Sequence, residues 1–468
     1  MLTIAMLAAV LAGGSNANSA VAPNPPNADR GLSTATLSAI VTRMRVPSYS
    51  RQTKLPCATC HYGFPQLTSF GRMFKLNGYT LTGLPLITAQ ADSDSRKTLD
   101  LSPIAPLSVM AIVSATNMSK ALPGTLATTT QFPQQLSLFA STAISDKMGI
   151  FSQFTYEDQA GTFGIDNVDV RFATHKSVAD HDMILGLTLH NNPTVQDVWN
   201  TTPAWSYPFT SAAVAPTPAA ATLIDGGLAQ SVLGFGAYSL YNNWLYAELT
   251  GYASAPQGVA LPLDSGATHT VHSVSPYWRV ALQHEFGENY LMVGTFGLSS
   301  KLFPTGVTGS TNDFMDNGVD AQLEHKLGEQ GGAIIGRASY IHEKQNLNAT
   351  FPAGESQNAS NTLNSYKFNV SYIPNATHTF TVAVFGTSGS SDNGLYAPAP
   401  VSGSSAAKPT SQGESFEFST NPWLNVRLGA QYVMYQKFNG SSNNYDLPVN
   451  GRRAKDNNAL YVYLWLAY

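Results

Sequence analysis

The clearest chemical pattern in the chain is formed by its only two cysteines and the histidine that follows them. The segment reads Cys57-Ala58-Thr59-Cys60-His61, which is the C-x-x-C-H pattern of covalent haem attachment. Two thiols at this spacing can add across the two vinyl groups of one porphyrin, and the adjacent imidazole reaches the iron as its proximal ligand. We therefore expect one covalent haem c, attached through Cys57 and Cys60 and ligated by His61.

Other uses of this motif fit its residues less well. A redox-active dithiol or a structural disulfide needs the two cysteines but not the histidine. A zinc site needs further Cys or His pairs at metal-ligand spacing, and both cysteines of the chain already belong to the motif. Haem attachment is the use that needs all three residues.

The residues around the motif predict a small haem-holding module. Pro65 suits the first turn of a helix, and Leu67, Phe70 and Phe74 then fall on one helical face that can lie on the porphyrin. The alternative is that these apolar side chains only pack among themselves. Four basic residues nearby either pair with the haem propionates or form a solvated basic face: Arg45, Arg51, Arg72 and Lys75.

The composition of the 468 residues excludes several classes of protein. Charged residues make up only 12%, so a coiled coil and a charge-rich disordered chain are excluded. The formal net charge of −4 is incompatible with the strongly basic face of a nucleic-acid binder. No apolar run of about eighteen residues follows the first dozen positions, which excludes a helical membrane protein. A chain poor in charge and rich in Gly, Ser, Thr, Asn and aromatic residues suits a closed antiparallel β-barrel.

The start of the chain predicts export. The first twelve residues are mostly apolar and Ser15-Asn16-Ala17 fits a small-x-small cleavage site, so we expect a signal peptide over residues 1–17. The basic residues that usually open such a segment are absent. We expect the monohaem cytochrome c module over residues 18–100 and the barrel over residues 101–468.

From about residue 104, apolar and polar residues alternate in segments of roughly ten, as they do in transmembrane β-strands. Asp169 and Arg171, for example, interleave with Val168, Val170 and Phe172. The alternation predicts a polar, lumen-facing set that includes Asn167, Asp169, Arg171, Arg279, Asp320, Glu324, Arg337 and Arg427. A soluble sandwich alternates in the same way, so alternation alone leaves both folds open.

The lengths of the connections favour the membrane barrel. About sixteen strands are expected, beginning near residues 104, 134, 147, 164, 182, 232, 243, 276, 289, 317, 332, 364, 377, 414, 424 and 458. Short connections such as Asn242-Asn243 alternate with long polar ones such as 191–231. Outer-membrane barrels have this order, with short periplasmic turns and long outer loops. A last strand that ends in an aromatic residue, here Tyr468, resembles the assembly signal of such barrels.

A signal peptide, one C-x-x-C-H module and a sixteen-strand barrel in one chain resemble the fused monohaem cytochrome–porins of bacterial outer membranes, whose best-known members are iron oxidases. The resemblance is most specific at Pro47-Ser48-Tyr49, from Phe64-Pro65 to Gly78-Tyr79, and at Asp456-Asn457-Asn458-Ala459-Leu460. It implies haem attachment at Cys57 and Cys60, proximal ligation by His61, and a cytochrome that plugs the barrel. The electron donor stays open, because members of the family occur in organisms with no obvious iron metabolism.

The resemblance implies a protein in the outer membrane of a Gram-negative bacterium that takes electrons from extracellular Fe²⁺. A periplasmic cytochrome or copper protein is the expected acceptor, and a haem within the membrane thickness keeps both electron hops short. Outer-membrane lipid is an expected partner and nucleic acid is not. We expect no catalytic acid, base or nucleophile, because electron transfer belongs to the cofactor. Two alternatives are a conduit for another donor or acceptor, and a diffusion porin that carries a haem module.

The sixth ligand of the iron is expected from the barrel wall, at Met110. This residue lies mid-strand on the lumen-facing side, and thioether ligation raises the potential of a haem. The alternative is that Met110 only fills space against the plug. Met73 and Met118 are less well placed. Two close pairs of possible iron ligands stand near long loops without being assigned as a site: Asp313 with Asp316, and His269 with His272.

Overall fold

The computed structural model of the chain describes residues 47–81, 87–90, 98–101, 105–157, 161–254, 269–328 and 332–468. These residues all belong to one unit of the chain, residues 44–468. The expected signal peptide over residues 1–17 lies outside the described residues. Arg45 and the beginning of the expected haem module lie outside them as well.

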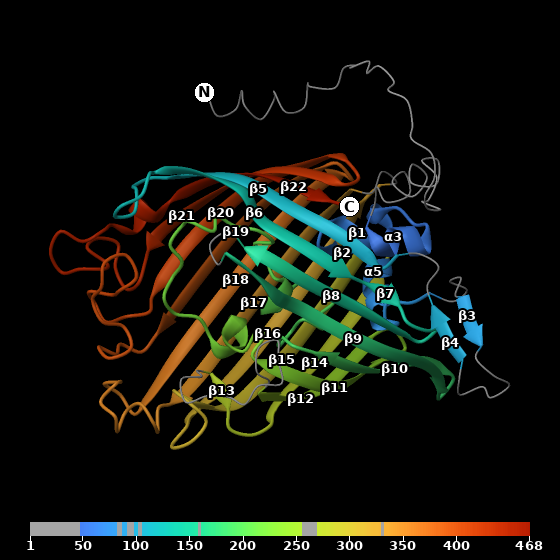
Figure 1. The fold of residues 1–468 in the computed structure, drawn as a ribbon, viewed down its shortest axis with the longest axis horizontal. Coiled ribbons are helices and arrows are strands. Elements are labelled where there is room, and N and C mark those ends of the chain that lie inside the picture. The colour runs from blue at the N-terminus through green and yellow to red at the C-terminus, as the bar shows by residue number, and fades with distance from the viewer. Residues whose placement is uncertain are drawn as a thin grey trace, which may run out of the picture. The chain divides into compact units, whose positions relative to one another are not determined.

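A closed antiparallel barrel dominates the fold (Figure 1). Over the described residues its wall has sixteen strands, because the two-residue β7 and β13 only add to the pairing of β8 and β15. The wall closes where the last strand, β22, pairs with β5. The strands are β5 (Leu107–Met118), β6 (Thr128–Ala140), β7 (Thr142–Ala143), β8 (Met148–Glu157), β9 (Thr162–Val178), β10 (His181–His190), β11 (Val232–Tyr241), β12 (Leu245–Ser254), β13 (Thr270–Val271), β14 (Ser275–Phe286), β15 (Asn289–Phe303), β16 (Asn312–Leu327), β17 (Gly332–Asn346), β18 (Ser360–Asn375), β19 (His378–Gly389), β20 (Ser411–Trp423), β21 (Val426–Lys437) and β22 (Ala459–Ala467).

The predicted barrel of about sixteen strands is therefore confirmed. Most strands begin within a few residues of their expected positions, and the largest difference is at β6, which was expected near residue 134 and begins at Thr128. None of the described helices is long and apolar enough to cross a membrane.

The two faces of the wall differ as the alternation predicts. The eight residues expected to face the lumen are all buried, and Asp169 and Arg171 are completely so. Their outward-facing neighbours are far more exposed, for example Phe172 at 39%, Val280 at 41% and Leu282 at 49%. Because successive strand side chains point to opposite faces, the wall has a polar interior and an apolar exterior, the pattern of a transmembrane barrel.

The two rims of the barrel carry connections of different length. Two-residue and three-residue turns such as 179–180, 242–244 and 424–425 join strands at one end, which we call the short-turn rim. Long connections such as 191–231 and 390–410 lie at the other, long-loop rim. An even number of strands brings the first residue of β5 and the last of β22 to the same end, the short-turn rim.

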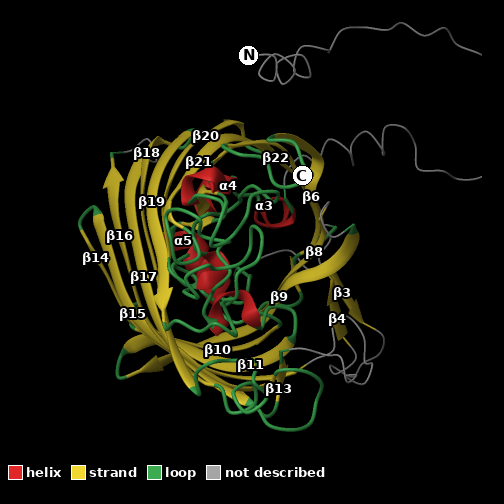
Figure 2. Ribbon diagram, turned by 90° about the vertical axis from the view of Figure 1, so that its left-hand side faces the viewer, coloured by secondary structure: helices red, strands yellow, loops and turns green. Residues whose placement is uncertain are grey.

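The chain that precedes the barrel lies partly inside it. The helices α3 (Ser48–Thr53), α4 (Cys57–Cys60) and α5 (Ser69–Leu76) lie within the ring of strands (Figure 2). A small hairpin of β1 (His61–Gly63) and β2 (Gln66–Leu67) joins α4 to α5. We call residues 47–81 the inner module. A separate two-stranded sheet, β3 (Ile87–Gln90) with β4 (Thr98–Leu101), follows the inner module, and the wall begins at Leu107.

The long connection 191–231 differs from its expected role as a solvated outer loop. Its first part turns into the lumen, where Val195 and Trp199 are no more than 1% exposed. Asp197 and Asp320 both form ion pairs with Arg279, at 3.4 and 2.5 Å. Burial of this part of the loop is favourable because the Asp197 carboxylate pairs with the buried Arg279 of the wall. Short helical turns lie in the loops at Pro203–Trp205, Leu223–Gly227 and Ala454–Asn457.

Candidate functional site

The cysteine–histidine motif forms a compact turn of the inner module. Cys57 and Cys60 are the first and last residues of α4, and His61 follows in extended backbone as the first residue of β1. Both thiols are free and half-buried. A Cβ at Gly71 would lie 2.2 Å from the carbonyl oxygen of Cys60, so only glycine allows α5 to pack this closely on the motif.

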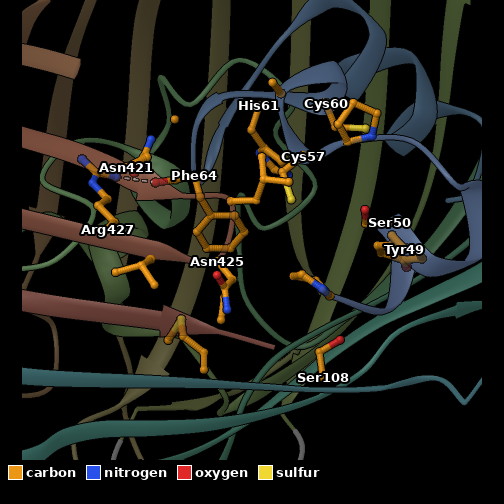
Figure 3. Close-up of a pocket in the computed structure, with 18 of the residues that line it drawn as sticks. Tyr49, Ser50, Cys57, Cys60, His61, Phe64, Ser108, Asn421, Asn425 and Arg427 are labelled. Carbon is orange, nitrogen blue, oxygen red and sulfur yellow. Dashed lines mark hydrogen bonds between the residues drawn. The ribbon is translucent and has the colours of Figure 1, made fainter. Parts of the chain in front are cut away.

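The motif borders a cavity of about 570 Å³ between the inner module and the wall. Figure 3 shows Cys57, Cys60 and His61 on the module side, with Ser108 and Arg427 coming from wall strands. The lining is mostly apolar and aromatic, and includes Tyr49, Phe64, Phe74, Met110, Phe139, Phe151 and Trp465. The volume falls within the range of small-molecule and cofactor sites.

The cavity lies at the short-turn rim. Its wall residues are the beginning of β5, the end of β22, and the turns around 376–377 and 421–425, all of which belong to that rim. The reason is topological: the inner module is joined to the start of β5, which is at the short-turn rim.

The imidazole of His61 has a ring nitrogen that forms no hydrogen bond. Its Nδ1 atom is buried without a hydrogen-bond partner, and a buried polar atom of this kind calls for an explanation such as a bound group. Burial lowers the pKa of His61 to about 4, so the ring is neutral. Burial also raises the pKa of Cys60 to about 11, which keeps this thiol protonated.

These features fit a covalently bound haem. Two thiols at vinyl spacing, an imidazole with a free ring nitrogen, and an apolar cavity of cofactor size meet at one place. The predicted attachment residues and proximal ligand therefore lie together. Their role in binding haem stays a prediction.

Met110 lies on the wall of the same cavity. Its side chain is 4% exposed and belongs to the lumen-facing side of β5, as expected. The other two methionines lie elsewhere: Met73 packs against the cluster around Leu76, and Met118 is buried at the far end of β5. Sixth ligation by Met110 is not tested by this arrangement and stays a prediction.

The predicted helix after the motif is only partly correct. Residues 61–67 form the β1–β2 hairpin, and α5 begins at Ser69, where the Thr68 hydroxyl accepts a bond of 3.2 Å from the Gly71 amide. Of the three apolar residues expected on the porphyrin, Phe74 lines the cavity and Phe70 is 38% exposed instead. Leu67 lies in β2, before α5 begins, so the three residues do not share one helical face.

The basic residues of the inner module attach it to the barrel. Arg72 forms a buried ion pair of 2.5 Å with Glu324 of β16. Lys75 donates to the carbonyl oxygens of Val195 and Asp197 at 2.7 and 2.8 Å. Arg51 donates to the Ala105 carbonyl at 3.0 Å. Arg72 and Lys75 are buried, so the solvated-face alternative is wrong for both, and none of the three lines the cavity.

Breaking the Arg72–Glu324 pair is expected to loosen the inner module. Arg72→Met keeps most of the packing over the Tyr290 ring but leaves the Glu324 carboxylate buried without its cation. Loss of one partner of a buried pair costs about 3–5 kcal/mol of unfolding free energy. Denaturant titration of the purified barrel measures this loss, and limited proteolysis reports release of the module.

The matched control replaces both partners. Arg72→Met combined with Glu324→Leu removes the buried charge altogether, so most of the stability should return. Equal destabilisation by the single and the combined changes would show that the ion pair has no such role.

Several residues of the cavity were not predicted as site residues. Tyr49, Trp465 and Arg427 all line it, and the sequence placed Arg427 only as one of eight lumen-facing residues. The rings of Phe64 and Trp465 pack edge to face, with centroids 5.4 Å apart, although the two residues are 401 positions apart in the chain. The spacing of residues along the chain cannot predict such a contact, because it forms only when the barrel closes.

The two pairs of possible iron ligands do not form sites. Asp313 pairs with Lys301 at 3.7 Å, while Asp316 points into the lumen and accepts from the Ile224 amide at 2.7 Å. His272 lies against the Phe303 ring. Among the described residues, no group of three or more His, Cys, Asp or Glu side chains is placed to hold a metal ion.

Comparison with known proteins finds solved structures of similar fold. No protein-family model and no curated protein matches the chain. The chain is similar to in-vitro folded OmpT of Vibrio cholerae, with 9% identity over 78% of this chain and 97% of that one and a TM-score of 0.42. It is also similar to an anion-selective porin from Comamonas acidovorans, with 13% identity over 77% and 99% and a TM-score of 0.42. The outer-membrane channel DcaP of Acinetobacter baumannii is similar as well, with 12% identity over 77% of this chain and 96% of that one and a TM-score of 0.40. The assignment of the fold rests on the strand pairings themselves.

Proposed function

We propose that this protein is an outer-membrane c-type cytochrome that oxidises extracellular Fe²⁺ and passes the electrons to a soluble periplasmic protein. The observation that carries the proposal is one cavity bordered by both cysteines, His61 and Met110. Cys57 and Cys60 are far apart in sequence from Met110, yet all of them face the same space. A haem c bound there supplies one-electron chemistry between Fe²⁺ and the acceptor.

The residues of the chain have separate tasks in this proposal. Cys57 and Cys60 would hold the porphyrin through thioethers, and His61 and Met110 would supply the ligands of its iron. Phe74 and Trp465 are buried and give the cavity part of its apolar lining. The Arg72 and Lys75 contacts keep the inner module in place against the barrel.

A location in the outer membrane is supported by the barrel's apolar exterior and its two unequal rims. In such barrels the short turns face the periplasm. A cavity at the short-turn rim supports transfer to a periplasmic cytochrome or copper protein, because the electron has a short distance to travel there. The Fe²⁺ donor meets the protein at the long-loop rim, and its electron, not the ion, crosses the lumen segment that contains the buried Trp199.

The test of this function uses the full chain purified with its haem. Its oxidised spectrum is followed after mixing with Fe²⁺ over a series of pH values, and with dithionite as the control for a reducible haem. We expect Fe²⁺ to reduce the haem. A haem that dithionite reduces but Fe²⁺ leaves oxidised at every pH overturns iron oxidation and favours a conduit for another donor or acceptor.

A diffusion porin that carries a haem module is the second candidate, and the sixteen-strand barrel favours it. The inner module and the segment around Trp199 occupy the lumen, which opposes an open channel. Ion conductance in planar bilayers separates the two functions. An open, conducting lumen would support the porin, and a closed one the cytochrome.

A further inference from the structure

Arg427 of β21 has an unusual position on the cavity wall. Among the described residues that line the cavity, it is the only lysine, arginine, aspartate or glutamate. Its side chain is 9% exposed, so the charge is almost completely removed from water. A buried cation in a mostly apolar cavity needs anionic partners.

The hydrogen bonds of Arg427 leave part of its guanidinium unused. One terminal nitrogen, Nη2, donates to Glu417 Oε1 at 2.8 Å. The other, Nη1, donates to the carbonyl oxygen of Phe64 at 2.6 Å (Figure 3). The third nitrogen, Nε, is buried without a partner. A buried N–H donor without an acceptor is destabilising, above all on a charged group, unless a bound group supplies the acceptor.

A carboxylate is the group that arginine binds best, through two parallel N–H donors. Haem carries two carboxylates in its propionates. The basic residues expected to bind them are engaged elsewhere: Arg72 with Glu324, and Lys75 with loop carbonyls. Arg427 does line the cavity, and its ion pair with Glu417 uses only Nη2 of its three nitrogens, so it is the cation within reach of a haem there.

We propose that Arg427 binds a propionate carboxylate of the haem and thereby joins the cofactor, the Phe64 backbone of the inner module and the barrel wall. The assignment rests on the proposed haem site. A positive charge beside the haem stabilises the reduced form and raises the reduction potential. Arg427 is thus a residue that sets the potential of the site as well as a positioning residue for the module.

The test compares Arg427→Gln and Arg427→Lys with the wild type, using the full chain in detergent. Redox titration followed by haem absorbance measures the potential, and the propionate band of the resonance Raman spectrum reports the hydrogen bond to the carboxylate. Arg427→Gln is expected to lower the potential and shift the Raman band. Arg427→Lys keeps the charge, so the potential stays closer to the wild-type value while the band still shifts.

Arg337→Gln is the matched control. Arg337 is also a buried arginine of the wall that bonds to the inner module, through Gln66 at 3.1 Å, but it does not line the cavity. Its loss should leave the potential and the propionate band unchanged. A wild-type protein without haem overturns the proposed function and this inference together. A haem whose potential and Raman band are unaffected by Arg427→Gln overturns only the role of Arg427.

Discussion

Replacing Cys57 and Cys60 together by alanine is expected to abolish covalent haem completely. The wild-type protein should keep its haem stain through denaturing electrophoresis, because two thioether bonds survive unfolding. The doubly substituted protein has no thiol left, since these are the only two cysteines of the chain. The stain at the position of the barrel measures the effect directly.

His61→Ala is the control within the motif. It leaves both thiols in place, so some covalent haem should remain while the absorbance spectrum changes with loss of the proximal ligand. Haem that extracts from the wild-type protein into acidified solvent would contradict covalent attachment. Staining that persists after both cysteines are replaced would contradict it as well.

The second large effect is expected at Met110. A methionine–iron bond gives the oxidised haem a charge-transfer band near the red end of its spectrum and raises the potential. Met110→Ala should remove this band and lower the potential. Because Met110 is buried on the cavity wall, the change also leaves a hole, which costs about 2–5 kcal/mol of stability.

Met118→Ala separates ligation from packing. Met118 belongs to the same strand and the same lumen-facing side, and it is 3% exposed, but it does not line the cavity. Its replacement should cost similar stability and leave the band in place. If the wild type lacks the band, or Met110→Ala keeps it, another residue or a water is the sixth ligand.

The wall of the barrel could be predicted closely because its signals are local. Asp169 and Val170 are neighbours in sequence and point to opposite faces, so their polarity alone indicates the lumen and the exterior. Short turns such as 242–244 mark one rim and long loops the other. The exit of both barrel ends at the short-turn rim follows from the even strand number, and it places the inner module there.

The site was predictable only in part. The C-x-x-C-H segment predicts haem attachment from five adjacent residues, and the lumen-facing position of Met110 follows from alternation along β5. The polar composition of the loop around Trp199 did not predict its inward turn. That turn depends on the ion pair between Asp197 of the loop and Arg279 of β14, which are far apart in sequence. The helix was expected to begin at Pro65 but begins at Ser69, because the residues on both sides of Pro65 form the β1–β2 hairpin.

The sequence by itself determined the C-x-x-C-H motif, the two faces of the strands and their number of about sixteen, since each depends on residues a few positions apart. Only the tertiary structure decided that Arg427 and Trp465 line the same cavity as the cysteine motif, and that Arg72 binds Glu324 instead of facing the cavity. These contacts join positions hundreds of residues apart. They exist because pairing of β22 with β5 closes the wall around the inner module, and no local pattern encodes that closure.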